Sequence, residues 1–220
     1  MDFSIASLPA ELVWISAALV LAVLWYESQR VGWRDLANGV QLGRLLGASV
    51  VLMLLWSLKA DLAPGYRLHL LGVTVLVLTF GRARALLAVA LGSLAATIGT
   101  SGELLSWPIN YALLGVLPAY LSDFCNRQLQ ARLPTHIFVF IFANACALAA
   151  VCMLAVGSAA TLVLWLGGSA PHVLLDEYLP YFLLLSFAEA WLSGMAITLL
   201  VVFCPGWVCS FDDRRYLLKK

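Results

Sequence analysis

One histidine, His69, lies near the start of an apolar run, RLHLLGVTVLVLTFG at positions 67–81. An imidazole in hydrocarbon loses its hydrogen bonds to water, so such a residue needs another partner. Two explanations are open: a solvated position at the membrane interface, or an inward-facing position that binds a ligand. Imidazole is the commonest metal-binding side chain and suits Zn, Cu, Fe and Ni. His69 is therefore a candidate metal ligand.

Two further features could complete a site around His69. The first is the N-terminus, MDFSIASLPAELVW, which has no basic residue of the kind that opens a secretory signal. We therefore expect the terminal amine of Met1 to be retained. A terminal amine and deprotonated amide nitrogens can complete a square-planar site for Ni(II) or Cu(II). The second feature is Asn110, in an apolar segment interrupted by Pro108 and Pro118.

Glu189 lies in the middle of the last apolar segment, at LLLSFAEAWLSGMAI. An ionisable group within a membrane span suggests a functional role by default. The structural alternative is that Glu189 pairs with Lys59 or Arg67, or hydrogen-bonds a serine such as Ser186 or Ser193.

The elements that must position these residues are membrane helices. The chain has 220 residues, of which 63% are hydrophobic and only 11% charged, whereas a soluble domain is about 25% charged. Seven hydrophobic segments are predicted, at 8–26, 42–60, 67–81, 84–100, 104–121, 135–157 and 179–204. The segment 158–170 either extends the sixth helix or lies at the interface. The fold class is thus all-α: a polytopic bundle with about seven transmembrane segments, the fifth broken, forming one domain over residues 1–220.

The basic residues predict an orientation. With the N-terminus outside, eleven of the thirteen Lys and Arg residues fall in inner loops or the C-terminal tail, as the positive-inside rule requires. The eleven are Arg30, Arg34, Arg44, Arg82, Arg84, Arg127, Arg132, Arg214, Arg215, Lys219 and Lys220. We therefore expect an N-out, C-in protein of the plasma (inner) membrane. A net charge of +1 without a basic patch gives no reason to expect nucleic-acid binding.

Three short motifs occur in order along the chain: HLLG at 69–72, WPINYALLGVLPAY at 107–120 and FAEAWLSGMAI at 187–197. In this order the sequence resembles the CbiM/NikM family, the substrate-capturing membrane components of energy-coupling factor (ECF) transporters for cobalt and nickel. The resemblance aligns His69, Asn110, Glu189 and Ser193 with family positions. It departs at Asp2, where the family has histidine.

The resemblance implies a metal site formed by the amine of Met1, Asp2 and His69, with Asn110 and Glu189 supporting it. The ligand would be a transported divalent ion, Co or Ni and possibly Zn, and no resident cofactor is expected. The implied partners are membrane lipid, a transmembrane coupling subunit and ATP-binding subunits. The chain itself is not expected to be an enzyme, because it has no G-x-x-x-x-G-K-[ST] motif.

Two alternatives remain. Asp2 keeps open a divergent, non-transporting membrane scaffold that has lost the metal site. The sequence GTSG at 99–102 fits the serine motif of rhomboid intramembrane proteases, but those need a histidine on a later helix to activate Ser101. His136 is predicted to lie on the opposite side of the membrane, so this alternative is the weaker one.

Overall fold

The computed structural model describes residues 10–63, 66–99, 103–212 and 216. Within these residues, six helical stretches are long and apolar enough to cross a membrane: 11–28, 39–57, 82–99, 104–132, 137–166 and 171–203. They correspond to six of the seven predicted segments, and the all-α membrane bundle is confirmed. Residues 158–166 continue the sixth helix.

The α-helices are α1 (Ala10–Ser28), α2 (Trp33–Leu36), α3 (Gly39–Ser57), α4 (Val73–Phe80), α5 (Arg82–Gly99), α6 (Trp107–Tyr111), α7 (Leu117–Arg132), α8 (Ile137–Val139), α9 (Leu148–Leu166), α10 (Pro171–Val173) and α11 (Leu179–Phe203). Three π-helical stretches join them, at Ala112–Val116, Phe140–Ala147 and Leu174–Tyr178, and 3₁₀ turns occupy Leu104–Ser106 and Pro205–Trp207. Two short antiparallel strands, β1 (Ala60–Ala63) and β2 (Tyr66–Leu68), form a hairpin.

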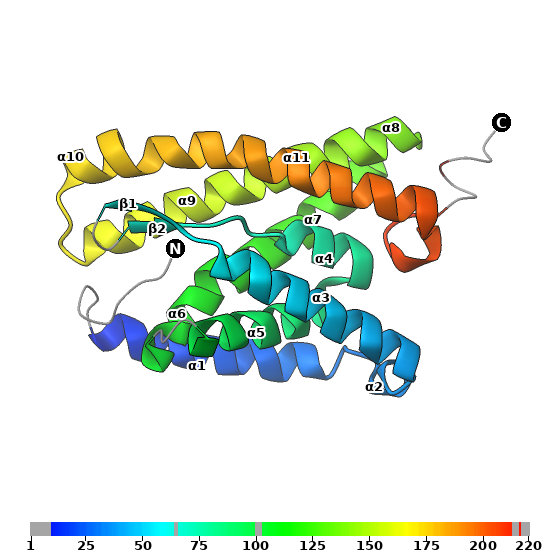
Figure 1. The fold of residues 1–220 in the computed structure, drawn as a ribbon, viewed down its shortest axis with the longest axis horizontal. Coiled ribbons are helices and arrows are strands. Elements are labelled where there is room, and N and C mark those ends of the chain that lie inside the picture. Colours follow the sequence, from blue (N-terminus) through cyan, green and yellow to red (C-terminus); the bar gives the residue numbers. More distant parts are fainter. Residues whose placement is uncertain (1–9, 64–65, 100–102, 213–215, 217–220) are drawn as a thin grey trace.

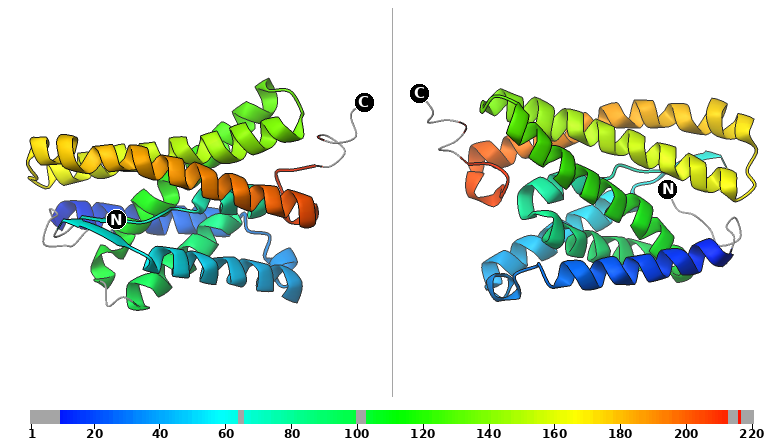
Figure 2. Two further views of the ribbon diagram at one scale, coloured as in Figure 1. Left: turned by 45° about the horizontal axis from the view of Figure 1, so that its top comes forward. Right: turned by 180° about the vertical axis from the view of Figure 1, so that it is seen from behind.

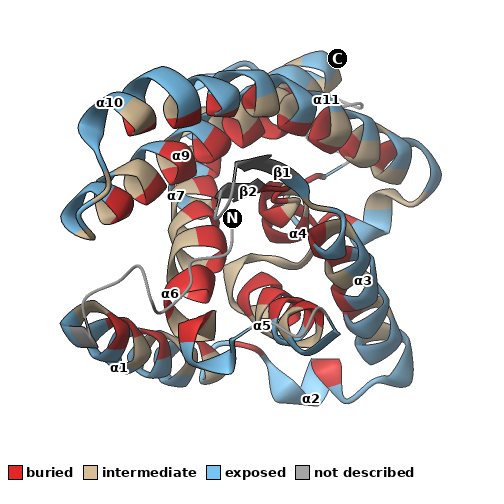
Figure 3. Cartoon of the chain, turned by 60° about the vertical axis from the view of Figure 1, so that its left-hand side comes forward, coloured by how far each residue is buried: buried red, intermediate tan, exposed pale blue. Residues whose placement is uncertain are grey.

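The long helices run roughly along the long axis of the molecule (Figures 1 and 2). Seen from one end, they surround the β1–β2 hairpin, with buried residues facing inward and exposed residues facing outward (Figure 3). The outward faces of the long helices carry large apolar side chains, among them Trp14, Trp25, Leu184 and Trp191. Apolar outer faces of this kind suit a bundle surrounded by lipid rather than water.

The third predicted segment, 67–81, is only partly helical. Its first residues belong to β2, residues 69–72 are neither strand nor helix, and the helix α4 occupies only Val73–Phe80. Fifteen residues of helix would reach only about 22 Å, short of the roughly 30 Å hydrocarbon core. Extended chain rises about 3.3 Å per residue, so the mixed conformation lets the same short segment reach farther.

The irregular fifth segment was predicted from its prolines. Residues 104–132 form one uninterrupted span, and the irregularity takes the form of the π-helical stretch Ala112–Val116 rather than a gap. Pro118 follows this stretch and has no N–H with which to bond the preceding turn. A local change to π-helical pairing is one way in which a proline-containing membrane helix satisfies its carbonyls.

The segment after α11 packs under α4. The backbone N–H groups of Cys209 and Ser210 donate to the carbonyls of Thr79 and Leu78, both at 3.1 Å. The Sγ of Cys209 also donates to the carbonyl of Leu78, at 3.5 Å. The tail therefore caps the C-terminal end of α4. We call this end of the bundle the tail end, and the opposite one the hairpin end.

Several basic side chains that the sequence analysis assigned to one side of the membrane lie at the tail end of the bundle. Arg82, at the start of α5, bridges Glu27 of α1 and Asp123 of α7. Arg84 pairs with Asp35 of α2 at 3.3 Å. Arg44 of α3 lies over the ring of Trp207, 4.4 Å from its centroid. Figure 1 shows the start of α1 and the tail at opposite ends, in keeping with an odd number of crossings.

Candidate metal site

His69 lies in the short irregular stretch between β2 and α4 and is 3% exposed. Its Nδ1 is 2.9 Å from the carbonyl oxygen of Leu70. Because a carbonyl oxygen only accepts hydrogen bonds, this contact places the proton of a neutral imidazole on Nδ1. Nε2 then carries the lone pair, which is the state in which histidine binds a metal ion.

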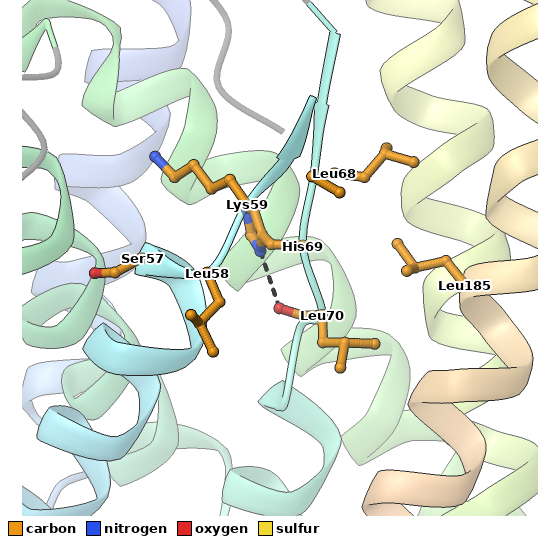
Figure 4. Close-up of a pocket in the computed structure, with 8 residues that line it drawn as sticks. Ser57, Leu58, Lys59, Leu68, His69, Leu70 and Leu185 are labelled. Carbon is orange, nitrogen blue, oxygen red and sulfur yellow. Dashed lines mark hydrogen bonds between the residues drawn. The ribbon is translucent and has the colours of Figure 1, made fainter. Parts of the chain in front are cut away.

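An open pocket of about 460 Å³ reaches His69. The pocket is lined by the C-terminal end of α3, the chain that follows it, the segment Leu68–Leu70, and Leu185 of α11. Figure 4 shows Lys59 and Leu58 on one side of His69 and Leu185 on the other. The imidazole is thus buried beside a space that a small ligand could reach.

Glu189 holds the chain that follows His69. Its Oε2 accepts from the N–H of Leu71 at 2.8 Å, and its Oε1 accepts from the N–H of Gly72 at 2.7 Å. The side chain of Ser193 lies beside the same carboxylate. Glu189 is 1% exposed, so both of its oxygens are used on groups within the bundle. Ser193 is one of the serines that the sequence offered as a partner, whereas the two main-chain N–H groups were not indicated by the sequence.

The carboxylate of Glu189 also lies at the N-terminus of α4, whose N-cap is Gly72. A negative charge at a helix N-terminus is favoured by the helix dipole and by the exposed N–H groups there. Gly72 has a φ of 68°, and a Cβ added to it would lie 3.1 Å from the side chain of Leu55. The glycine of HLLG is therefore required by the turn from extended chain into helix.

Trp56 is the residue of this region that the sequence did not single out. It is buried near the end of α3, its indole Nε1 donates to the carbonyl of Leu71 at 3.0 Å, and its ring centroid lies 4.9 Å from that of His69. A tryptophan at the end of a membrane helix ordinarily indicates an interfacial anchor. Nothing in its sequence position distinguishes it from the other seven tryptophans.

The structure places the other predicted site residues as follows. Asn110 is buried in α6 and its Nδ2 lies 3.4 Å from Ser106 Oγ. Met1 and Asp2 lie outside the described residues, as does Ser101 of the GTSG motif.

His136 accepts from the N–H of Phe138 at 3.2 Å and so caps the start of α8. His69 and Glu189 are brought together through Leu71 and Gly72.

Within residues 10–63, 66–99 and 103–212, no three His, Cys, Asp or Glu side chains are grouped so that they could hold one ion. Met1 and Asp2, the other two ligands predicted from the sequence, lie outside these residues.

Residues 4–207 match the family described as CbiM, cobalt uptake substrate-specific transmembrane region. Two solved structures share the fold. "Crystal Structure of an transition metal transporter" is 16% identical, covers 91% of this chain and 92% of its own, and superposes with a TM-score of 0.78. "Crystal Structure of an Truncated Transition metal Transporter" is also 16% identical, covers 92% and 99%, and has a TM-score of 0.77. A comparison with curated protein sequences finds no match.

Proposed function

The chain belongs to the CbiM family of cobalt-uptake transmembrane proteins, and on this basis we propose that it captures a divalent cobalt or nickel ion for an ECF-type importer. As a family member it is a multi-pass membrane component of metal uptake. We propose which ion it captures, which residues bind that ion, and that it works with ECF subunits.

The observation that carries the proposal is the state of His69. The imidazole is buried, its Nδ1 is engaged by Leu70, and it borders an open pocket. A neutral imidazole that keeps a lone pair on Nε2 is a ligand for Co(II) and Ni(II). We assign Nε2 of His69 to the ion, together with the terminal amine of Met1 and a donor from Asp2.

Glu189 serves this site indirectly. Its hydrogen bonds to Leu71 and Gly72 fix the chain just after the ligand. Fixed supports of this kind orient metal-binding histidines, and their loss weakens metal affinity by about ten- to a hundredfold. We propose the same supporting role for Asn110, which is buried in α6.

Asp2 sets an expectation about selectivity. A carboxylate oxygen is a harder ligand than the imidazole that the family has at this position, so it discriminates less strongly in favour of nickel. We therefore expect Co(II) and Zn(II) to compete with Ni(II) at this site.

Energy for uptake would come from separate subunits. The chain carries no phosphate-binding G-x-x-x-x-G-K-[ST] motif. In this proposal ATP-binding subunits hydrolyse ATP and act on this chain through a transmembrane coupling subunit, while the chain itself supplies the metal site.

Titration calorimetry of the tag-free protein in detergent, with Ni(II), Co(II) and Zn(II), tests the proposal. We expect one ion per chain, loss of binding in His69→Ala, and weakened binding when residues are added before Met1. His136→Ala is the matched control, because His136 is an exposed helix cap and its loss should leave binding unchanged. Folded wild type that binds none of the three ions would instead favour a membrane scaffold that has lost the site.

A further inference from the structure

Trp56 lies against the candidate ligand without belonging to the ligand set. It is 4% exposed, and its ring is tilted by 42° to the imidazole of His69 at a centroid distance of 4.9 Å. The two residues come from different parts of the chain, α3 and the irregular stretch before α4. A flat ring at this distance limits how far the imidazole can turn.

The indole of Trp56 also fixes the backbone beyond His69. Its Nε1 donates to the Leu71 carbonyl at 3.0 Å, while the Leu71 N–H donates to Glu189 at 2.8 Å. The peptide groups on both sides of Leu71 are thus held by side chains from two helices, α3 and α11. Residues 69–72 lie outside the helices and strands of the bundle, so side chains supply hydrogen-bond partners that a helix or strand would otherwise provide.

We propose that Trp56 is a positioning residue for the metal ligand His69. Its N–H sets the path of the chain at Leu71, and its ring limits rotation of the imidazole, so that Nε2 keeps one direction as the ion binds. This inference rests on the proposed function, because it requires His69 to bind the ion. It adds a residue that acts through His69 without touching the metal.

The role separates into two parts that substitutions can distinguish. Trp56→Phe keeps an aromatic ring beside His69 but removes the donor to Leu71. Trp56→Leu removes both the ring and the donor. Trp25→Phe and Trp191→Phe are matched controls, because each of these tryptophans is 73% exposed on the outer face of the bundle.

The first experiment measures Ni(II) affinity by calorimetry and the visible absorption spectrum of the Ni(II) complex in all five proteins. We expect Trp56→Phe to weaken binding by about tenfold and Trp56→Leu by up to about a hundredfold. Both should shift the Ni(II) absorption bands, because the direction of the bound nitrogen changes. A role in packing alone would lower thermal stability without moving those bands.

A second measurement uses the wild-type protein and therefore does not depend on whether the Trp56 variants fold. Bound Ni(II) should quench the emission of a tryptophan packed against its ligand. As Ni(II) is added, wild-type tryptophan fluorescence should therefore fall to a plateau, with the same midpoint concentration as in calorimetry. The fall should persist in Trp25→Phe and Trp191→Phe.

The outcomes separate the two proposals. Wild type that binds Ni(II) without quenching, or a folded Trp56→Phe with wild-type affinity and spectrum, overturns the role of Trp56 and leaves the proposed function standing. Wild type that binds neither Ni(II), Co(II) nor Zn(II) overturns both.

Discussion

Glu189 and Glu27 are both 1% exposed within the bundle, yet they bind different kinds of partner, and only Glu189 has hydrogen bonds to both of its carboxylate oxygens. Glu189 binds the main-chain N–H groups of Leu71 and Gly72. Glu27, at the tail end of α1, binds Arg82 at 2.9 Å and accepts from the hydroxyl of Tyr120 at 2.7 Å. One carboxylate therefore fixes a length of backbone, whereas the other is part of an ion-pair network.

The network at the tail end joins three helices. Arg82 of α5 binds Glu27 of α1 and Asp123 of α7, and Asp123 also binds Arg127 at 2.9 Å. A buried charge with an opposite partner ties helix ends together, but removing one member leaves the other uncompensated. The comparison indicates that Glu27, at the tail end, joins helices to one another, whereas Glu189, in the middle of α11, positions the segment that carries His69.

Removing the arginine of the network should have the largest effect on folding. Arg82→Met leaves Glu27 buried without its cation, and we expect the free energy of unfolding to fall by about 3–5 kcal/mol. Denaturant titration in detergent micelles measures this loss. The double variant Glu27→Gln/Arg82→Met should recover part of it, and the folded fraction of Arg82→Met should keep wild-type Ni(II) affinity. A loss of affinity would show that the two regions are coupled.

Glu189→Gln should have a smaller effect on folding and a larger one on binding. The amide keeps one oxygen acceptor but turns an NH₂ group toward a main-chain N–H, for an expected loss of about 1–3 kcal/mol. Ni(II) affinity should fall by about tenfold, because the chain after His69 loses a fixed partner. Calorimetry compares the Ni(II) affinity of Glu189→Gln with that of Arg82→Met. If Glu189→Gln binds Ni(II) as tightly as wild type, the proposed supporting role of Glu189 is wrong.

Asp123→Asn should be milder than Arg82→Met. Asp123 bridges Arg82 and Arg127, its side chain is 14% exposed, and the asparagine oxygen can still accept one of the two bonds. We expect a loss of about 1 kcal/mol in the free energy of unfolding, with no change in metal affinity. A loss as large as that of Arg82→Met would mean that Asp123, rather than Glu27, is the main partner of the arginine.

Asp35→Asn should have the smallest effect. Asp35 pairs with Arg84 at 3.3 Å, but its side chain is 79% exposed. Exposed ion pairs contribute about 0–1 kcal/mol and are screened by salt. Unfolding curves at low and high salt should therefore nearly coincide for this variant and wild type. A clear difference at low salt that vanishes at high salt would show that the pair contributes more than expected.

The sequence predicted most of the helical architecture because hydrophobic span length is a local property. Six of the seven predicted segments are full-length helical spans. The prolines of the fifth segment correctly indicated an irregular helix, since a missing N–H has its effect within one turn. The segment 67–81 was harder to read, because composition does not reveal whether an apolar residue lies in extended or helical chain.

Only part of the candidate site could be predicted from the sequence. The type and neighbours of His69 marked it as a possible ligand, and an acid within a span marked Glu189. The support that Glu189 gives to Leu71 and Gly72 spans more than a hundred positions of sequence, and the indole of Trp56 reaches Leu71 across fifteen. Such partners follow from the packing of helices and not from any local pattern.

The sequence by itself determined that this chain is a helical membrane protein and where six of its spans lie, and it supplied the hypothesis that His69 binds a metal ion. It could do so because burial in lipid and the chemistry of imidazole depend on residue type and local order. Only the tertiary structure decided that residues 69–72 are neither helix nor strand and that α3 and α11 supply hydrogen-bond partners for them. Irregular backbone in a membrane protein is tolerated where it is buried in protein or lines a cavity, and the side chains that bind it here meet it only once the bundle has folded.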